Sequence, residues 1–374
     1  MELGLLPALG GSIAELRSSG QDSRLIDGYL RPYSQAFDRV WYFSYQPESL
    51  ADYTDDSGLL SSVRVLAPRR RVPRLWRALT LPVARRQSFR RCAVLRVFQL
   101  TGTIPALVAR ALWGTPFVTT YGFWYARLSR PGPVRLAKRL LEHVGLRLAS
   151  GVIVPTEELR AHVLGIAPGS RVHLIPNGVD TARFAPGDRR PEGARRILYV
   201  GRLEAEKNLS ALVAAAARLR SRFPLRLTLV GAGSLEPQLR AQAGELGVTA
   251  EFPGVVDHRR LPEHFRQADV FVLPSFTEGH SKALIEAMAS GLPCVASDCP
   301  GNRALVRDGE TGLLFDPRSP ESLADALARV LGEASLASNL GRRVRELATS
   351  EYDLRALVEQ EIRILLDVAR TRGA

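Results

Sequence analysis

Short apolar runs alternate with longer amphipathic segments along most of the chain. In the first half, runs that predict strands lie at residues 2–7, 39–44, 63–68, 95–100, 116–121, 151–155 and 172–176. In the second half, strands are expected at residues 196–200, 226–230, 250–253, 270–274, 293–297 and 312–315. Helical patterns fall between strands at residues 133–149, 208–222, 234–246, 281–290 and 319–332. This alternation indicates parallel sheets joined by crossover helices.

The chain is long enough for two domains. Its 374 residues exceed the roughly 250 at which a single core usually stops growing. Proline and glycine residues break any regular pattern between residues 180 and 195. We therefore expect two doubly wound, Rossmann-like α/β domains that face each other, at residues 1–182 and 183–352. Ligands of such sheets bind at the carboxyl ends of the strands, so the expected site is a cleft between the domains.

Composition excludes several classes of protein. The longest stretch without a charged residue, 111–126, has 16 residues, which is shorter than the about 18 that span a bilayer. Glu2 follows Met1 directly, so no basic region of a signal peptide is recognised. The three cysteines have the spacing of neither a disulfide framework nor a zinc site. These features favour a cytoplasmic protein.

Positive charge is concentrated in one segment. Residues 57–141 contain 17 Arg and Lys and no Asp or Glu. The clusters are Arg69, Arg70, Arg71, Arg74 and Arg77, then Arg85, Arg86, Arg90 and Arg91, and the apolar residues among them are Trp76, Leu79, Leu81, Val83 and Phe89. Such a block attracts an anionic surface, for instance the inner face of a membrane, to which the protein would bind peripherally. The five apolar residues would then lie at the protein surface and could dip into the headgroup region. Only three of the 51 basic residues are Lys, so a solvated face in an arginine-rich protein remains an alternative.

Two segments of the second half carry side chains suited to chemistry. In the first, residues 199–208, Arg202 and Lys207 project from a loop at the carboxyl end of a strand. A forked guanidinium and a compact ammonium can neutralise a diphosphate leaving group. The alternative is a pair of solvated surface charges.

The second segment, residues 274–288, places Glu278 in a loop just after a buried strand. Ser281 can cap the following helix, which leaves the amides of residues 282–284 free to bind an anion. Glu286 lies about one and a half turns into that helix, where a carboxylate can accept hydrogen bonds from both hydroxyls of a ribose. An ordinary exposed helix position would fit Glu286 as well.

Taken together, these segments resemble the signature of a large glycosyltransferase family. The elements are Gly-Arg-Leu…Lys-Asn at 201–208, Glu-x7-Glu at 278–286, Ile-Pro-Asn-Gly-Val-Asp at 175–180 and Asp-Gly-Glu-Thr-Gly-Leu-Leu at 308–314. In this order they resemble the retaining glycosyltransferases of family 4, the glycosyl transferases group 1, which have the GT-B fold. The first half is similar only through Gly10-Gly11 and its strand pattern.

The resemblance implies a role for each matching position. Arg202 and Lys207 would hold the diphosphate of a nucleotide-sugar donor, Glu278 would lie beside the transferred sugar, and Glu286 would bind the ribose. The remaining substrate-binding positions implied are Gly10 and Gly11 at the phosphates, and the backbone of His280, Ser281, Lys282 and Ala283 at the sugar and phosphate. The first domain would receive a glycan or lipid-linked acceptor, and a C-terminal helix at residues 353–374 would cross back to that domain.

The chain departs from the family pattern at two positions. Tyr121 stands where many members have a histidine that contacts the donor sugar, so this contact could pass to Tyr121 as a substrate-binding residue or be absent. Ala304 stands where a glutamate is common. No Asp-x-Asp occurs, so a metal is not expected and Arg202 and Lys207 would take its place. No cofactor is expected, since the nucleotide sugar is a substrate. The sugar, the base and the acceptor are left open.

Two other functions are weighed against this interpretation. Gly231-Ala-Gly233 after a strand suggests a dinucleotide-dependent oxidoreductase, but Glu236 occupies the position of the third glycine. A non-enzymatic protein that binds nucleic acid or a membrane would explain residues 57–141 but not the second half. No helix-turn-helix, zinc-finger or RNP pattern is visible, so a nucleic-acid partner is not expected.

Overall fold

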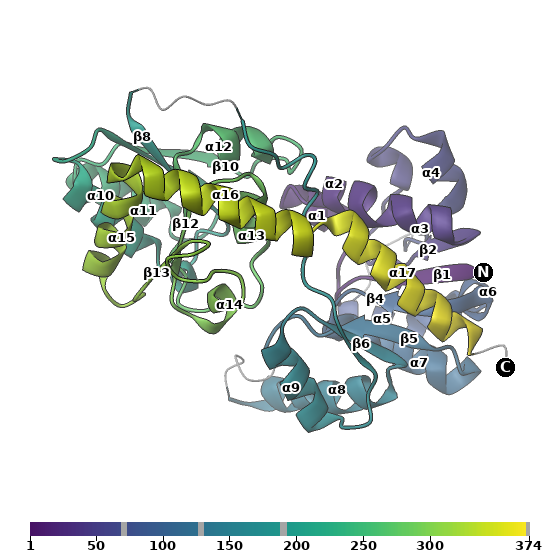
Figure 1. Cartoon of the computed structure of the whole chain (residues 1–374). Coiled ribbons are helices and arrows are strands. Elements are labelled where there is room, and N and C mark those ends of the chain that lie inside the picture. Colours follow the sequence, from purple (N-terminus) through teal and green to yellow (C-terminus); the bar gives the residue numbers. More distant parts are fainter. Residues whose placement is uncertain (69–72, 126–130, 188–192, 372–374) are drawn as a thin grey trace. The chain divides into compact units, whose positions relative to one another are not determined.

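The computed structural model describes residues 1–68, 73–125, 131–187 and 193–371. The chain forms two units, of which unit 1 comprises Met1–Pro176 and Arg355–Ala374, and unit 2 comprises Asn177–Leu354. The sequence placed these two boundaries at 182/183 and 352/353. Each unit contains a parallel sheet with helices packed on it, so the predicted α/β class with two Rossmann-like domains is confirmed (Figure 1).

Unit 1 is built on a seven-stranded sheet in the order β3-β2-β1-β4-β5-β6-β7. Neighbouring strands pair in parallel throughout this sheet. The strands are β1 (Glu2–Leu6), β2 (Arg39–Tyr42), β3 (Val63–Val65), β4 (Cys92–Val97), β5 (Phe117–Thr120), β6 (Gly151–Val154) and β7 (Val172–Leu174).

The helices of unit 1 cover both faces of that sheet. Those that follow β1 and β2 are α1 (Ile13–Ser18), α2 (Asp22–Leu25), the π-helix η1 (Ile26–Leu30), α3 (Arg31–Ala36), the 3₁₀ turn η2 (Leu50–Asp52) and α4 (Ser57–Ser62). Those between β3 and β7 are α5 (Arg74–Ala84), α6 (Arg86–Arg91), η3 (Leu100–Gly102), α7 (Thr103–Trp113), α8 (Pro133–Leu148) and α9 (Glu157–Ile166). Helix α7 contacts α5 and α8, and α8 contacts α9, so these four helices form a continuous layer.

Side chains of the central strand β4 alternate between the two faces. Leu95 and Val97 belong to a buried cluster with Phe89 of α6 and Ala106 of α7. Arg96, between them, pairs instead with Glu361 of the C-terminal helix α17 (Leu354–Arg370), at 2.6 Å between Nε and Oε1. Helix α17 therefore packs on the face of the sheet opposite to α6 and α7.

The pair of Arg96 and Glu361 is buried within unit 1. A second bond of 3.0 Å joins the Nη2 of Arg96 to the Oε2 of Glu361, and the hydroxyl of Tyr33 on α3 also donates to Glu361. Burial is the main cause that raises the pKa of Tyr33 well above its usual value, so this hydroxyl stays a donor. Two donors thus satisfy a carboxylate that would be costly to bury alone, and they fasten α17 to unit 1.

Unit 2 is built on a six-stranded parallel sheet in the order β10-β9-β8-β11-β12-β13. Its strands are β8 (Arg195–Val200), β9 (Leu225–Val230), β10 (Ala250–Gly254), β11 (Val270–Leu273), β12 (Cys294–Ser297) and β13 (Leu313–Phe315). Its helices are η4 (Ala205–Lys207), α10 (Leu209–Leu219), α11 (Glu236–Glu245), α12 (Leu261–Gln267), α13 (Lys282–Ala289), α14 (Pro300–Arg303), α15 (Pro320–Gly332) and α16 (Ala334–Glu351). All four residues of β11 are buried, as its apolar sequence predicts for a sheet covered on both faces.

Each of the thirteen strand segments expected from the sequence overlaps a strand of the structure. The largest difference between an expected and an observed first residue of a strand is at β4, which begins at Cys92 rather than at residue 95. Within unit 2, the helices α12, α14 and α16 were not predicted. Within the described residues, no helix combines the length and the apolar character needed to cross a bilayer.

Candidate active site

The loops at the carboxyl ends of β8 and β9 pack closely because glycines line their contact. A Cβ atom on Gly231 would lie 1.9 Å from the carbonyl oxygen of Gly201, and one on Gly233 would lie 2.3 Å from that of Leu203. Any side chain at either position would force the loops apart. The Gly-Ala-Gly pattern considered as a dinucleotide fingerprint is therefore explained by loop packing.

Lys207 and Glu278 meet at this edge of the sheet. The Nζ of Lys207 at the end of η4 lies 2.6 Å from the Oε1 of Glu278, which follows β11. Their side chains are 15% and 11% exposed, so the pair is largely removed from water. The hydroxyl of Ser275 donates to the same Oε1 at 2.6 Å. The fold thus brings together Lys207 and Glu278, which lie 71 residues apart in the sequence. They belong to the two segments that the sequence predicts to carry chemistry.

Backbone contacts hold these segments in register. The amide of Phe276 donates to the carbonyl oxygen of Glu206 at 3.0 Å. Asn208 adopts a left-handed conformation with φ of 55°, and its side-chain amide donates to the carbonyl oxygen of Pro317 at 2.8 Å. Asparagine tolerates this conformation better than most residues, and it turns the chain directly into α10.

Arg202 lies at the same edge but faces solvent. Its Nη2 is 2.6 Å from the Oε1 of Glu206, and the arginine side chain is 70% exposed. The hydroxyl of buried Tyr199 donates to the carbonyl oxygen of Arg202 at 2.8 Å, which fixes the backbone of this loop. An exposed ion pair contributes little to stability. Arg202 can therefore exchange Glu206 for an anionic ligand at little cost.

Ser281 caps helix α13 as predicted. Its Oγ accepts a hydrogen bond from the amide of Leu284 at 3.4 Å. The prediction that all three amides of residues 282–284 would be free is wrong, because the cap itself occupies that of Leu284. Lys282 and Ala283 form the first turn of α13. Their contact with a sugar or phosphate stays a prediction.

His280 is buried just before this cap. Its Nδ1 accepts from the amide of Asn177 at 3.3 Å, and its carbonyl oxygen accepts from the side-chain amide of Asn177 at 2.7 Å. Burial lowers the pKa of His280 to about 4, so the ring is neutral near pH 7 and can accept that bond. Asn177, the first residue of unit 2, therefore binds both the imidazole and the carbonyl oxygen of His280. The contact of the His280 backbone with substrate stays a prediction.

Glu286 is buried in α13, which removes the alternative of an ordinary exposed helix position. Its Oε1 lies 2.9 Å from the Nε2 of His258, and both side chains are 4% exposed. The ring of His258 also packs on Phe184, with 5.1 Å between ring centroids. A buried carboxylate needs such a polar partner. Sequence reasoning missed His258, because no motif places it. The binding of a ribose by Glu286 stays a prediction.

A second set of polar residues supports the Glu278 loop, and it was also missed. The Oγ of Ser297 donates to the carbonyl oxygen of Ser275 at 2.5 Å, and the side-chain amide of Asn302 donates to the Oγ of Ser297 at 3.0 Å. A Cβ on Gly301 would lie 2.4 Å from the carbonyl oxygen of Glu278. These residues come from β12 and α14, so only the sheet order brings them to the loop.

The substrate-binding residues predicted in unit 1 lie at the carboxyl ends of β1 and β5. Gly10 has a φ of 90°, and a Cβ there would lie 2.7 Å from the Cδ of Arg74. The amide of Gly11 closes the turn on the carbonyl oxygen of Ala8 at 2.8 Å. Tyr121 is buried, and its hydroxyl donates to the Oε1 of Glu142 at 3.1 Å. Tyr121 therefore has a packing role in unit 1, and the predicted substrate contacts of these three residues stay predictions.

The basic segment is less uniformly exposed than the sequence suggested. Arg77 is buried, and its Nη2 donates to the carbonyl oxygen of Ser44 at 2.6 Å. Leu81 and Phe89, which were expected at the surface, are buried in unit 1 because they face the sheet from α5 and α6. Arg69, Arg70 and Arg71 lie outside the described residues. The exposed part of the segment includes Arg74, Arg86, Arg90 and Arg91.

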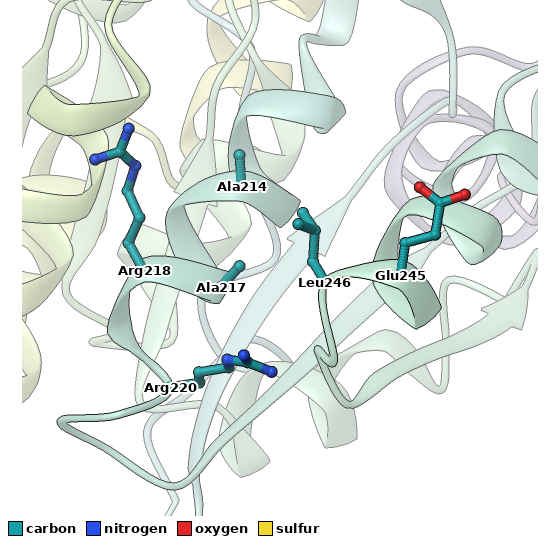
Figure 2. A pocket seen from close by; sticks show the side chains of 6 residues that line it. All are labelled: Ala214, Ala217, Arg218, Arg220, Glu245 and Leu246. Carbon is teal, nitrogen blue, oxygen red and sulfur yellow. The ribbon is translucent and has the colours of Figure 1, made fainter.

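Figure 2 shows the side chains that line a hollow in the surface of unit 2. Its lining residues are Ala214, Ala217, Arg218, Arg220, Glu245 and Leu246. They come from the second half of α10 and the end of α11, whereas the active-site loop joins the first residue of α10, Leu209. The guanidinium of Arg218 is paired with Glu321. This hollow therefore brings no catalytic groups together.

Solved structures similar to this chain share its fold. Sucrose-phosphate synthase from Thermosynechococcus elongatus superposes with a TM-score of 0.81 at 22% identity, over 99% of this chain and 100% of that one. HepE of Anabaena in complex with UDP superposes with a TM-score of 0.77 at 18% identity, over 98% of this chain and 100% of that one. Both similarities support the GT-B architecture.

Sequence relatives are more similar over shorter stretches. Glycogen synthase of Mycobacterium tuberculosis is 36% identical over 208 residues, which are 54% of this chain and 50% of that protein. Phosphatidyl-myo-inositol mannosyltransferase of Mycolicibacterium smegmatis is 36% identical over 204 residues, 53% of this chain and 52% of that protein. D-inositol 3-phosphate glycosyltransferase of Paenarthrobacter aurescens is 32% identical over 64% of each chain. The chain thus spans about half the length of the first two relatives.

Two family descriptions cover most of the chain. Residues 33–183 match Glycosyltransferase Family 4, and residues 181–347 match Glycosyl transferases group 1. The second match contains Arg202, Lys207, Glu278 and Glu286, of which the structure pairs Lys207 with Glu278 and places Arg202 at the same edge of the unit 2 sheet. The chain therefore belongs to the group 1 glycosyl transferases of family 4, with the GT-B fold.

Proposed function

We propose that this protein is a glycosyltransferase that moves a sugar from a nucleotide-diphosphate donor, with retention, to a glycan or lipid-linked acceptor. The observation that carries the proposal is the pairing of Lys207 with Glu278 beside Arg202, at the carboxyl edge of a parallel sheet. Ligands bind at this edge in doubly wound folds. Anabaena HepE, a protein of the same fold, is solved with UDP and with UDP-glucose, which supports a donor of this class.

In the proposed reaction, the bond between the anomeric carbon and the diphosphate oxygen breaks and its electron pair stays on the diphosphate. The acceptor oxygen forms the new bond to that carbon and passes its proton to the departing diphosphate. Negative charge therefore grows on the departing diphosphate. Arg202 and Lys207 are placed to stabilise that charge, Lys207 in a largely water-excluded position where electrostatic interactions are stronger. These two cations are the basis for proposing a reaction that needs neither a metal nor a cofactor.

Glu278 has two functions in this proposal. In the structure, its Oε1 holds the ammonium of Lys207 and the hydroxyl of Ser275. Both donors lie on Oε1, and in the proposal Oε2 contacts the transferred sugar. Glu286, oriented by His258, would accept the ribose hydroxyls, and the first turn of α13 would approach the sugar and phosphate.

The acceptor is proposed by class only. The three relatives are named for glycogen synthesis, for transfer to phosphatidyl-myo-inositol and for transfer to D-inositol 3-phosphate. Glycan, lipid and phosphorylated acceptors therefore all occur among similar proteins. The basic segment 57–141 favours an anionic or lipid-linked acceptor, and we propose peripheral attachment to an anionic membrane surface through this part of unit 1.

A panel of nucleotide sugars tests the proposed function. The panel would contain UDP, GDP and ADP sugars, each measured for a thermal shift and for release of the nucleotide diphosphate. We expect at least one donor to raise the unfolding temperature and to be slowly hydrolysed, and Lys207→Met to lower the rate of hydrolysis by about 10² or more. If no nucleotide or nucleotide sugar shifts the unfolding temperature of the folded protein, the proposal is wrong.

A further inference from the structure

Helix α8 turns its largest apolar side chains away from the core of unit 1. The residues at intervals of four along its outer face, here called the α8 stripe, are Leu136, Leu140, Val144 and Leu148. Their exposed fractions are 70%, 65%, 37% and 43%. The buried side carries Glu142, Gly145 and Leu146. The usual arrangement of an amphipathic helix, with its apolar face toward the core, is thus reversed over most of α8.

Contacts on the inner side fix this orientation. The carboxylate of Glu142 accepts the hydroxyl of buried Tyr121 at 3.1 Å. A Cβ on Gly145 would lie 3.3 Å from the Oγ1 of Thr103 and 3.4 Å from the Cδ1 of Leu100, so the helix backbone sits directly on η3 and α7 at this point. The helix cannot rotate the α8 stripe inward without losing these contacts.

A second apolar surface lies in the same layer of helices. On α5, Trp76, Leu79 and Val83 are 65%, 46% and 58% exposed, whereas Ala78 and Leu81 on the opposite side are buried. Helices α5 and α8 both contact α7, which lies between them in the layer. Large exposed apolar surfaces on a folded protein mark a place where another surface binds.

The charges around the stripe select the binding partner. Arg139 and Arg147 are exposed basic residues of α8, Arg135 and Lys138 are half-buried, and Glu142, its single acidic residue, is buried on the inner side. Two copies of this chain packed stripe to stripe would bring these positive charges together. An anionic lipid surface complements both the charge and the apolar stripe, and basic amphipathic helices bind bilayers in this way.

We propose that α8 lies in the headgroup region of an anionic bilayer, with the α8 stripe in contact with the acyl chains and the exposed Arg139 and Arg147 at the lipid phosphates. Trp76, Leu79 and Val83 of α5 extend this lipid-binding surface. This inference rests on the membrane attachment in the proposed function, and it identifies the helices of unit 1 that make the attachment. It is independent of sugar transfer, because vesicle binding is measured without donor or acceptor.

The experiment is co-sedimentation of the full chain with vesicles of phosphatidylglycerol and phosphatidylcholine, compared with vesicles of phosphatidylcholine alone. We expect binding to the anionic vesicles at low salt that weakens at about 0.5 M salt, where charges are strongly screened. The variant Leu136→Gln/Leu140→Gln should weaken binding by about tenfold or more for each leucine, the contribution of an aliphatic side chain that leaves water. Leu246→Gln, which changes an exposed leucine of unit 2, is the matched control and should bind like the wild type.

Three results would overturn the proposal. One is a wild-type protein that ignores anionic vesicles at low salt. Another is equal binding by the wild type and the double variant, which would assign attachment to a different surface. The third is a concentration-dependent dimer that the double variant abolishes, without vesicle binding, which would make the stripe an interface between copies. Circular dichroism should show a fold unchanged in the double variant, since both leucines point outward.

Discussion

Because Lys207 and Glu278 form a pair, we predict that substituting both residues affects stability and catalysis differently. The variants are Lys207→Met, Glu278→Gln and the double variant. Each single change removes one partner of a hydrogen-bonded ion pair whose side chains are 15% and 11% exposed. A hydrogen bond to a charged group contributes about 1.5–3 kcal/mol, so each single variant should lose about that much unfolding free energy. In the double variant neither charge is left alone, and we expect most of the loss to be recovered.

Activity should behave in the opposite way. Loss of one preorganised charge stabiliser lowers turnover by about 10² to 10³, or 2.7–4 kcal/mol. Lys207→Met should therefore lose about that factor, and the double variant should stay as inactive as the single variants, because stability is restored without the cation. Activity is measured as kcat and kcat/KM with the donor identified by the nucleotide-sugar panel, and unfolding free energy by urea titration.

Arg202→Ala completes the design. Its side chain is 70% exposed, so we expect almost no change in stability but a loss of about 10² in turnover. Arg240→Ala is the matched control, since Arg240 forms an equally local pair with Glu236 on α11. Recovery of activity together with stability in the double variant would show that the Lys207–Glu278 pair is only structural. Near-wild-type turnover in both Arg202→Ala and Lys207→Met would refute the assignment of the leaving-group site.

Three further predictions follow from the site. Glu286→Gln should weaken binding of the free nucleotide diphosphate by about 1.5–3 kcal/mol in calorimetry, whereas unchanged affinity would leave Glu286 only as the structural partner of His258. Activity should persist in EDTA, and complete loss that Mg²⁺ or Mn²⁺ restores would contradict the cationic mechanism. Burial lowers the pKa of His280 in the folded protein to about 4, whereas the pKa of the same side chain in the unfolded chain is near 6.5. The unfolded chain therefore binds more protons than the folded protein between pH 4 and pH 6.5. The unfolding free energy should thus fall by about 3 kcal/mol from this group as the pH drops from 6.5 to 4, and His280→Phe should lose that part of the pH dependence in urea titrations.

The sequence alone determined the order of the strands along the chain and the segments that carry chemistry. Apolar runs such as residues 270–273 predict buried strands because the pattern is local, and the loops after them reach the same edge of a parallel sheet by geometry. The meeting of residues 199–208 with 274–288 therefore follows from the strand pattern and the two motifs. Ser281 is likewise recognisable as a helix cap from its neighbours.

Only the tertiary structure decided which partners those residues have and which faces are buried. Nothing near Glu286 in the sequence indicates His258, and nothing near Glu278 indicates Ser297 or Asn302, because these side chains arrive from other strands and helices. The sequence predicted a helix at residues 133–149 without determining which side faces the core. That choice depends on Tyr121 and Thr103, which occupy the inner side and leave Leu136 and Leu140 exposed. Periodicity describes one segment, whereas burial is set by all the segments that pack against it.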